Sequence, residues 1–112
     1  MKVRTSKLDG ETTVIEVEDG DEGEVVDMLH MRENGFAIFG EAVPIPMAVV
    51  DGRLFREEWF TSNHFLAIEA HELGHIRMKS NEEDVAEREG IRLLQEAGYS
   101  DAANLLIERG IV

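Results

Sequence analysis

The stretch FLAIEAHELGHIRM, from Phe65 to Met78, decides how the rest of this sequence can fold. Plotted at about 100° per residue, its apolar side chains leave no wide polar face, which is typical of a buried helix. We expect this helix to begin at about Arg56 or at about Thr61 and to end near Lys79. The rest of the chain must therefore supply the layers that cover it.

The first part of the chain predicts a β-hairpin. Residues 2–8 and 12–18 alternate weakly between apolar and polar side chains. Between them lies Asp9-Gly10, a dipeptide favoured in hairpin turns.

Two further short strands are predicted over residues 36–39 and 47–50, which are rich in strand-forming residues. Pro44 and Pro46 lack the N–H that a sheet ladder needs. The second of these strands is therefore expected to start just after the prolines or to lie at a sheet edge.

Three more helices are predicted from apolar residues at helical spacing, each followed by a glycine. Asn34-Gly35 is interpreted as a left-handed helix terminator, and Ser100 as an N-cap. The helices are expected at Glu24–Arg32 before Asn34-Gly35, at Asn81–Ala97 before Gly98, and at Ser100–Arg109 before Gly110.

Strands followed by helices predict an α+β fold. We expect a small N-terminal sheet, antiparallel or mixed, packed on the central helix, with backing and C-terminal helices. At 112 residues the chain is expected to form one domain, spanning 1–112.

Composition excludes several classes of function. The net charge of −13 disfavours nucleic acid as a partner, and no basic patch offsets it. The longest nearly apolar run, Ala42–Val50, is too short for a membrane span, which needs about twenty residues. No targeting segment is recognised, so a cytoplasmic location is expected. Because the chain has no cysteine, any metal must be held by His, Asp or Glu.

The motif His71-Glu72-Leu73-Gly74-His75 predicts a zinc site on the central helix. Residues four apart project from one face, so the two imidazoles can bind one Zn²⁺. Glu72 is turned about 100° away, where it can reach a zinc-activated water as a general base. The alternative is that the histidines are hydrogen-bonded core residues and Glu72 lies on the helix surface.

A zinc site of this kind normally takes a third protein ligand. Helix periodicity puts Glu83 about 35° from the centre of the next helix's apolar stripe, which makes it the preferred ligand. Glu82 and Glu87 lie about 65–75° away and remain alternatives, whereas Asp84 points nearly opposite.

Two of these carboxylates have other interpretations. Ser80 and Glu83 could instead form an S-x-x-E capping box. Glu87 could accept a hydrogen bond from a zinc-binding imidazole, or it could be a solvated surface acid. Ala86 and Gly90, with Gly74, predict a close approach of the two helices.

The HELGH motif followed by Glu83-Asp84-Val85-Ala86-Glu87 resembles the gluzincin clan of metallopeptidases. It is most similar to the catalytic domains of HtpX, CAAX-prenyl-protease and BlaR type, and to their soluble single-domain versions, the minigluzincins. The similarity covers roughly Pro46 to Gly98.

This resemblance implies a zinc-dependent endopeptidase acting on peptide or protein substrates. It also implies that Met47-Ala48-Val49-Val50 forms the upper rim of the cleft, and that residues 99–112 cover the cleft in a latent form. The clan's E-x-x-x-D pattern has Glu87 here in place of Asp. Because the domain has little room for a lower lobe, a partner protein or a homodimer is expected to complete the groove.

Candidates for stabilising the oxyanion of the reaction are Tyr99, Arg88 and Arg92, with Tyr99 preferred because Gly98 places it at a bend. His64 lies too far along the helix to share the zinc and is interpreted as an exposed or capping histidine. The competing function is a regulatory or interaction module that binds zinc but has no activity.

Overall fold

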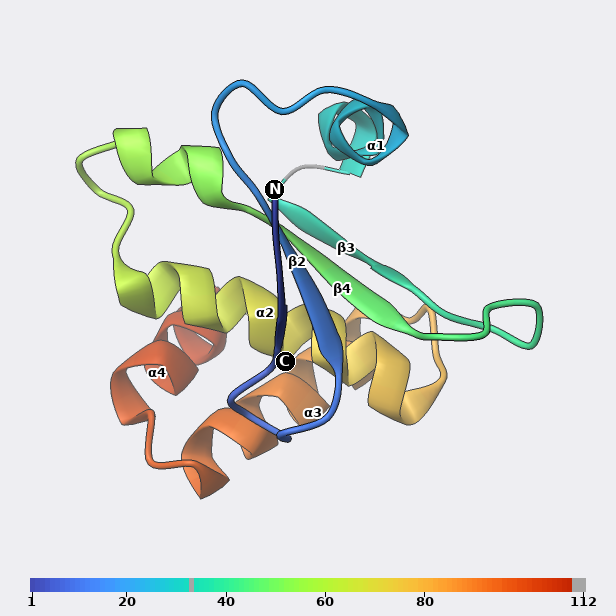
Figure 1. The fold of residues 1–112 in the computed structure, drawn as a ribbon. Helices are drawn as coiled ribbons and strands as arrows, with labels where there is room; N and C mark the ends of the chain where they lie inside the picture. Colours follow the sequence, from blue (N-terminus) through green and yellow to red (C-terminus); the bar gives the residue numbers. More distant parts are fainter. Residues whose placement is uncertain (33, 110–112) are drawn as a thin grey trace.

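A computed structural model gives the fold of residues 1–32 and 34–109 (Figure 1). Four strands form one mixed sheet with the order β1-β2-β4-β3. β1 pairs antiparallel with β2, β2 parallel with β4, and β4 antiparallel with β3. The strands are β1 (Lys2–Thr5), β2 (Thr13–Val17), β3 (Gly35–Ile38) and β4 (Met47–Asp51).

The predicted hairpin is present, with shorter strands than expected. The Asp9 carboxylate accepts hydrogen bonds from the backbone N–H groups of Glu11 and Thr12, at 3.0 Å each. Gly10 adopts a φ of +72°, which favours glycine. The residues between the strands are therefore held in a side-chain-supported turn.

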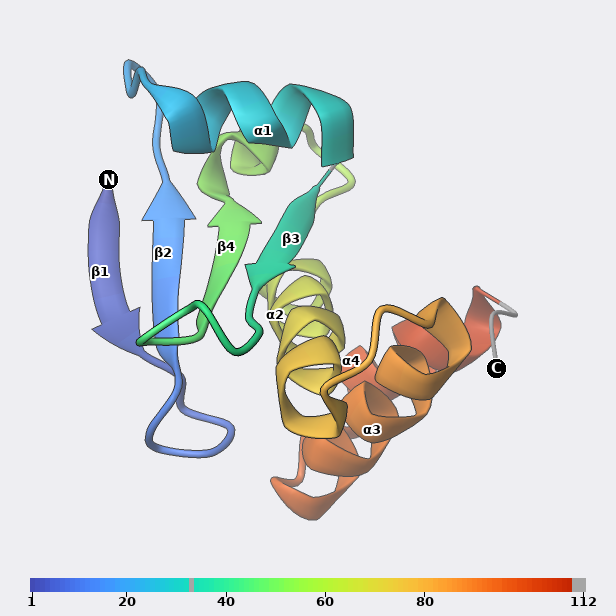
Figure 2. The same cartoon turned by 90° about the vertical axis from the view of Figure 1, so that its right-hand side faces the viewer.

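Helix α1 (Glu24–Arg32) has the predicted bounds and lies across one end of the sheet (Figure 2). Its buried residues, Val26 and Leu29, pack with Ile15 and Val49 from one face of the sheet. The opposite face packs against α2 (Ser62–Met78). The sheet is thus covered by helices on both faces.

The expectation that Asn34-Gly35 is a left-handed terminator is wrong. Gly35 does not have a positive φ and instead begins β3. A Cβ on Gly35 would lie 2.8 Å from the carbonyl oxygen of Val49 and 2.9 Å from Cγ2 of Ile68. Glycine is needed here because β3 is wedged between β4 and α2.

Helix α2 is the central element, as its sequence predicts, and it is buried from Phe65 to His75. A short 3-10 helix, η1 (Gly52–Arg56), precedes it, so the later of the two predicted start points is the right one. The Thr61 side chain caps its first turn, and Lys79 ends it with a φ of 50°.

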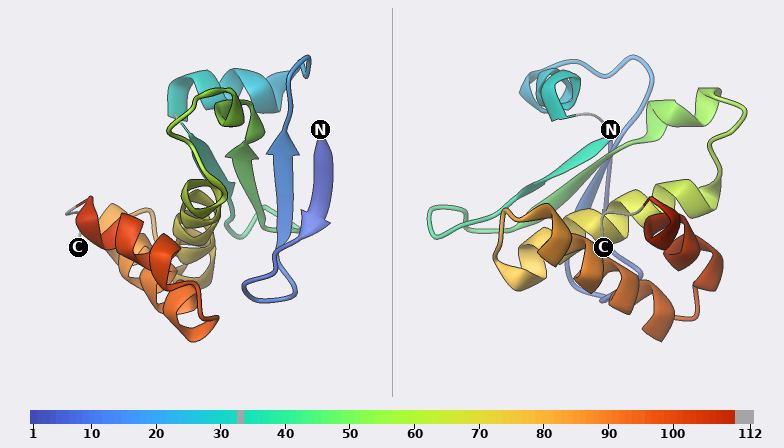
Figure 3. Two further views of the ribbon diagram at one scale, coloured as in Figure 1. Left: turned by 90° about the vertical axis from the view of Figure 1, so that its left-hand side faces the viewer. Right: turned by 180° about the vertical axis from the view of Figure 1, so that it is seen from behind.

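Helices α3 (Glu83–Glu96) and α4 (Ser100–Glu108) lie on the side of α2 that faces away from the sheet (Figure 3). α3 packs closely on α2 because Gly74 lies against Ala86, and Gly90 against Ala70. The close helix approach predicted from these small residues is therefore confirmed.

Ser100 is the first residue of α4 rather than its cap, because Tyr99 occupies the N-cap without a side-chain hydrogen bond. Gly110, the predicted terminator, lies outside the described residues. The α+β class with a mixed sheet is confirmed. Among the described helices, none is long and apolar enough to cross a membrane.

The structure decides between the two positions expected for β4. β4 starts directly after Pro46, as one of the two alternatives predicted, but it lies between β2 and β3 inside the sheet. The proline therefore costs no ladder bond, since pairing begins at Met47. The edge strand next to α2 is β3.

Candidate metal centre

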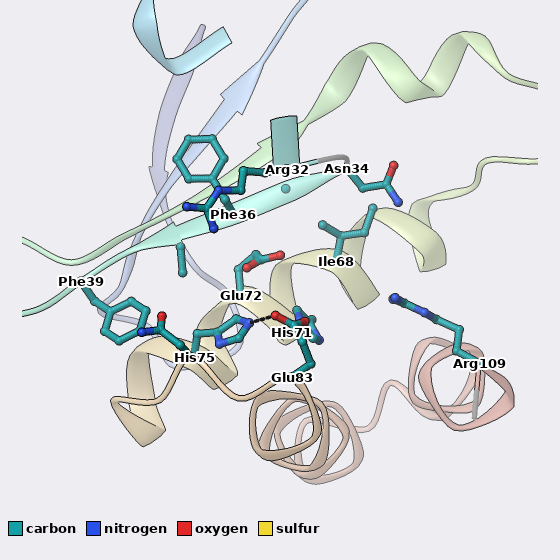
Figure 4. Close-up of a pocket in the computed structure, with 13 residues that line it drawn as sticks. Arg32, Asn34, Phe36, Phe39, Ile68, His71, Glu72, His75, Glu83 and Arg109 are labelled. Carbon is teal, nitrogen blue, oxygen red and sulfur yellow. Dashed lines mark hydrogen bonds and ion pairs between the residues drawn. The ribbon is translucent and has the colours of Figure 1, made fainter. Parts of the chain in front are cut away.

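The two motif histidines project from consecutive turns of α2 toward the start of α3 (Figure 4). Their ring centroids are 4.9 Å apart, and both side chains are buried. Nε2 of His71 lies 2.8 Å from Oε2 of Glu83, and Nε2 of His75 lies 3.3 Å from Oε1 of the same carboxylate. Three potential ligands from two helices thus meet at one point.

The other nitrogen of His75 is held by the backbone. Its Nδ1–H donates to the carbonyl oxygen of Ser80 at 2.7 Å. That carbonyl reaches the ring because Lys79 turns the chain back in the left-handed conformation, with the Ser80 N–H bonded to the carbonyl of His75. A proton on Nδ1 leaves the lone pair of Nε2 available for a cation.

A carboxylate, rather than a backbone carbonyl, faces the Nδ1 atom of His71. Its Nδ1 lies 3.3 Å from Oε2 of Glu87, within ion-pair distance, although the geometry is not that of a directed hydrogen bond. Glu87 is completely buried, so it is not a solvated surface acid. Burial lowers the pKa of His71, but the carboxylates of Glu87, Glu72 and Glu83 outweigh it and leave this pKa raised.

The expected alternative role of Glu83 as a helix cap is not observed. Glu82 is the N-cap of α3 and makes no side-chain capping bond, while Ser80 Oγ accepts from the backbone N–H of Glu82. Asp84 is occupied by an ion pair with Arg88 at 3.1 Å. Glu83 is thus the carboxylate at the start of α3 that reaches the histidines.

Glu72 is a second carboxylate close to the same point. One of its oxygens and one nitrogen of each histidine all lie within 4.8 Å of one another. Glu83 is the better candidate for a third ligand, because its oxygens contact both Nε2 atoms directly.

The donor set fits a zinc ion. Two imidazole nitrogens and one carboxylate are a common three-residue zinc set that leaves a further position open. Nδ1 of His71 and both oxygens of Glu87 are buried without a hydrogen bond among the described residues. A divalent cation bound at Nε2 of His71 would make the Nδ1–H group of the same ring a stronger donor toward Glu87. Its positive charge would also offset the negative charge of the buried Glu87 carboxylate.

Burial has a large effect on Glu72, whose residue is 7% exposed. Desolvation, helped by the nearby carboxylates of Glu83 and Glu87, raises the pKa of its carboxyl to about 7 against the opposing charges of His71 and Arg109. A carboxyl with this pKa can exchange a proton near neutral pH, as a general base must.

In metal-free protein, Glu72 is expected to make folding stability depend on pH. Since its pKa is raised from 4.5 to about 7 by folding, its contribution is present below pH 4.5 and is lost as the pH rises through 7. Between pH 5 and 8 this loss amounts to about 2–3 kcal/mol. Urea unfolding of chelator-treated protein measures the free energy of unfolding, which should fall for wild type relative to Glu72→Gln over this range. A difference between the two proteins that stays constant with pH would contradict the prediction.

The cluster opens into a pocket of about 440 Å³ between α2 and the edge strand β3 (Figure 4). β4, expected to form the upper rim, is separated from the pocket by β3, and none of its residues lines it. β3 takes that place because it pairs outside β4. The pocket is lined by Arg32, Asn34, Gly35, Phe36, Ala37, Phe39, Ile68, His71, Glu72, His75, Asn81, Glu83 and Arg109.

The structure does not bring Tyr99 to the cluster. It lies at the N-cap of α4, is 36% exposed and does not line the pocket. Arg88 and Arg92 do not line it either, since they pair with carboxylates on the surface of α3. His64 accepts a hydrogen bond from the backbone N–H of Thr61 and acts as a capping residue, as one interpretation predicts.

Residues 99–109 of the expected covering segment mostly lie behind α2. Helix α4 buries Ala102, Ala103 and Leu106 against α2 and α3. From this segment only Arg109 lines the pocket among the described residues, and 110–112 lie outside them.

Four polar residues of the pocket were missed by sequence reasoning. Arg32 ends α1, Asn34 precedes β3, Asn81 lies shortly before α3, and Arg109 is the C-cap of α4. No local pattern joins them, because they meet only through the packing of the helices around the β3–α2 cleft.

Comparison with known proteins adds no relative. No family model, no curated protein and no solved structure matches this chain. Function must therefore be inferred from the site itself.

Proposed function

We propose that this protein is a zinc-dependent metallopeptidase that cleaves internal peptide bonds. His71, His75 and Glu83 would hold the zinc ion, and Glu72 would be the general base. The observation that carries the proposal is the orientation of the two imidazoles: their Nε2 atoms converge on Glu83 while Ser80 and Glu87 face their Nδ1 atoms.

Zinc bound there would lower the pKa of a water molecule and polarise the substrate carbonyl. The Glu72 carboxylate would take a proton from the attacking water and deliver it to the nitrogen of the leaving amine. Its near-complete burial keeps bulk water away from that proton. The Ser80 carbonyl holds the His75 ring by a hydrogen bond, and the Glu87 carboxylate faces Nδ1 of His71. Both contacts favour imidazole orientations that present Nε2 to the metal.

An extended peptide is the substrate shape that suits the pocket. β3 pairs with β4 along one edge only, and three of its residues, Gly35, Phe36 and Ala37, line the cleft. Its outer edge therefore offers backbone donors and acceptors beside the motif helix, where a peptide can add as a further strand. A cytoplasmic location and a homodimer remain predictions from the sequence.

Metal analysis of purified protein tests the site. Wild type is expected to retain one zinc per chain, whereas His71→Ala and Glu83→Ala should bind zinc at least about 100-fold more weakly. Glu82→Ala is the matched control, because Glu82 is an exposed neighbour outside the pocket. Equal zinc in all four proteins would rule out this ligand set.

Cleavage of a mixed peptide library by zinc-loaded wild type then tests the activity. Zinc binding without cleavage of any peptide would favour the competing function, a zinc-binding regulatory or interaction module.

A further inference from the structure

Six of the eight arginines in the chain form ion pairs with carboxylates, as expected in a protein with 24 acidic residues. The two that form none among the described residues are Arg32 and Arg109, and both line the candidate active-site pocket. The paired arginines are Arg4, Arg53, Arg56, Arg77, Arg88 and Arg92.

The two residues approach the pocket from opposite sides (Figure 4). Arg32 extends from the end of α1 over β3, while Arg109 reaches in from the end of α4. A peptide lying along β3 would pass between the two guanidinium groups. Asn34 lines the same pocket and offers a further amide donor.

Helix electrostatics alone does not account for this arrangement. Cations are favoured at helix C-termini, and both arginines lie at such ends. That effect explains why α1 and α4 each end with an arginine. It does not explain why the ends of α1 and α4, which are far apart in the sequence, present their cations to one cavity.

The second simple explanation is charge balance with the carboxylates of the site. Glu72 and Glu83 lie in the pocket, yet neither arginine is within ion-pair distance of them among the described contacts. A guanidinium that is close to a carboxylate cluster but not bound to it keeps its donors available. These five donors, in a planar fork, match the two oxygens of an incoming carboxylate.

We propose that Arg32 and Arg109 form a carboxylate-binding site that selects peptides with an acidic group close to the bond to be cleaved. The inference rests on the proposed peptidase function and names its substrate class. The carboxylate can belong to an Asp or Glu side chain or to a free peptide C-terminus, since both present the same group. The acidic surface of the rest of the molecule confines the attraction for such a peptide to the pocket.

Binding is measured on zinc-loaded Glu72→Gln protein, so that no turnover is needed. Fluorescent alanine-rich octapeptides carry one Glu, or one Gln, at each position in turn, with either a free or an amidated C-terminus. Fluorescence polarisation should show one or two positions at which Glu binds about three- to tenfold more tightly than Gln. A preference that depends on the free C-terminus instead identifies the terminal carboxylate as the ligand.

The preference should disappear in Arg109→Gln and fall in Arg32→Gln, both in the Glu72→Gln background. Arg88→Gln, which alters a paired arginine outside the pocket, should keep it. The preference should also weaken as salt is raised from 50 to about 500 mM. Equal binding of Glu and Gln peptides, a preference that survives both substitutions, or no binding of any peptide would each overturn the proposal.

These outcomes separate the two proposals. Absence of cleavage by zinc-loaded wild type contradicts the peptidase function and leaves the binding preference measurable. Cleavage without any enrichment of acidic residues near the cut bond contradicts only the carboxylate site.

Discussion

Glu72→Gln is expected to lower the rate of peptide cleavage by about a hundredfold to ten-thousandfold while zinc remains bound. Glutamine has nearly the shape of the glutamate, so the buried position can accept it. It cannot take a proton from water at neutral pH, however, and the step assigned to Glu72 would lose its base. Zinc should stay because its three assigned ligands, His71, His75 and Glu83, are unchanged.

The measurement is kcat on the best library peptide, with zinc content determined on the same sample. Glu82→Gln is the matched control, since it alters an exposed carboxylate that does not line the pocket. A Glu72→Gln protein that binds zinc and cleaves at the wild-type rate would remove Glu72 from the mechanism. Loss of zinc together with activity would instead make Glu72 a ligand.

Gly74→Ala is expected to cost at least about 3 kcal/mol of folding stability, although alanine is the better helix former. A Cβ at Gly74 would lie 2.1 Å from the carbonyl oxygen of Ala86 and 2.8 Å from its carbonyl carbon. Because these are backbone atoms, no side-chain rotation can relieve the overlap, and α3 must move away from α2. That movement also carries Glu83 away from the histidines.

Thermal unfolding of chelator-treated protein measures this effect without the contribution of metal. A fall in Tm of about 10–20 °C is expected for Gly74→Ala. Gly90→Ala is the matched comparison, because its Cβ would lie 2.9–3.2 Å from the backbone of Ala70 and His71. It should destabilise the fold less. A Gly74→Ala protein as stable as wild type would show that the helix spacing is looser than the structure indicates.

Much of the local structure was predictable because it depends on neighbours in the sequence. The apolar run around the HELGH motif predicted a buried helix, and periodicity along the next helix selected Glu83 over Glu82 and Asp84. Both inferences use only the rotation of about 100° per residue. For the same reason α1 was predicted with its observed bounds, Glu24–Arg32.

Errors arose where the decisive contact was between distant segments. Asn34-Gly35 resembled a helix terminator, but Gly35 is required by its contacts with Val49 and Ile68. Tyr99 follows a glycine bend in the sequence, yet it lies at the N-cap of α4 and does not line the pocket.

The HELGH motif, the side of the next helix on which Glu83 lies and the α+β class follow from the sequence itself, since the motif and the helical and strand periodicity are local features. Which strand borders the cleft was decided only by the tertiary structure, because β4 pairs with both β2 and β3 and so leaves β3 at the edge. The same holds for Arg32 and Arg109. Their common pocket exists only because α1 and α4 pack around α2 and the sheet, and no spacing along the chain encodes that meeting.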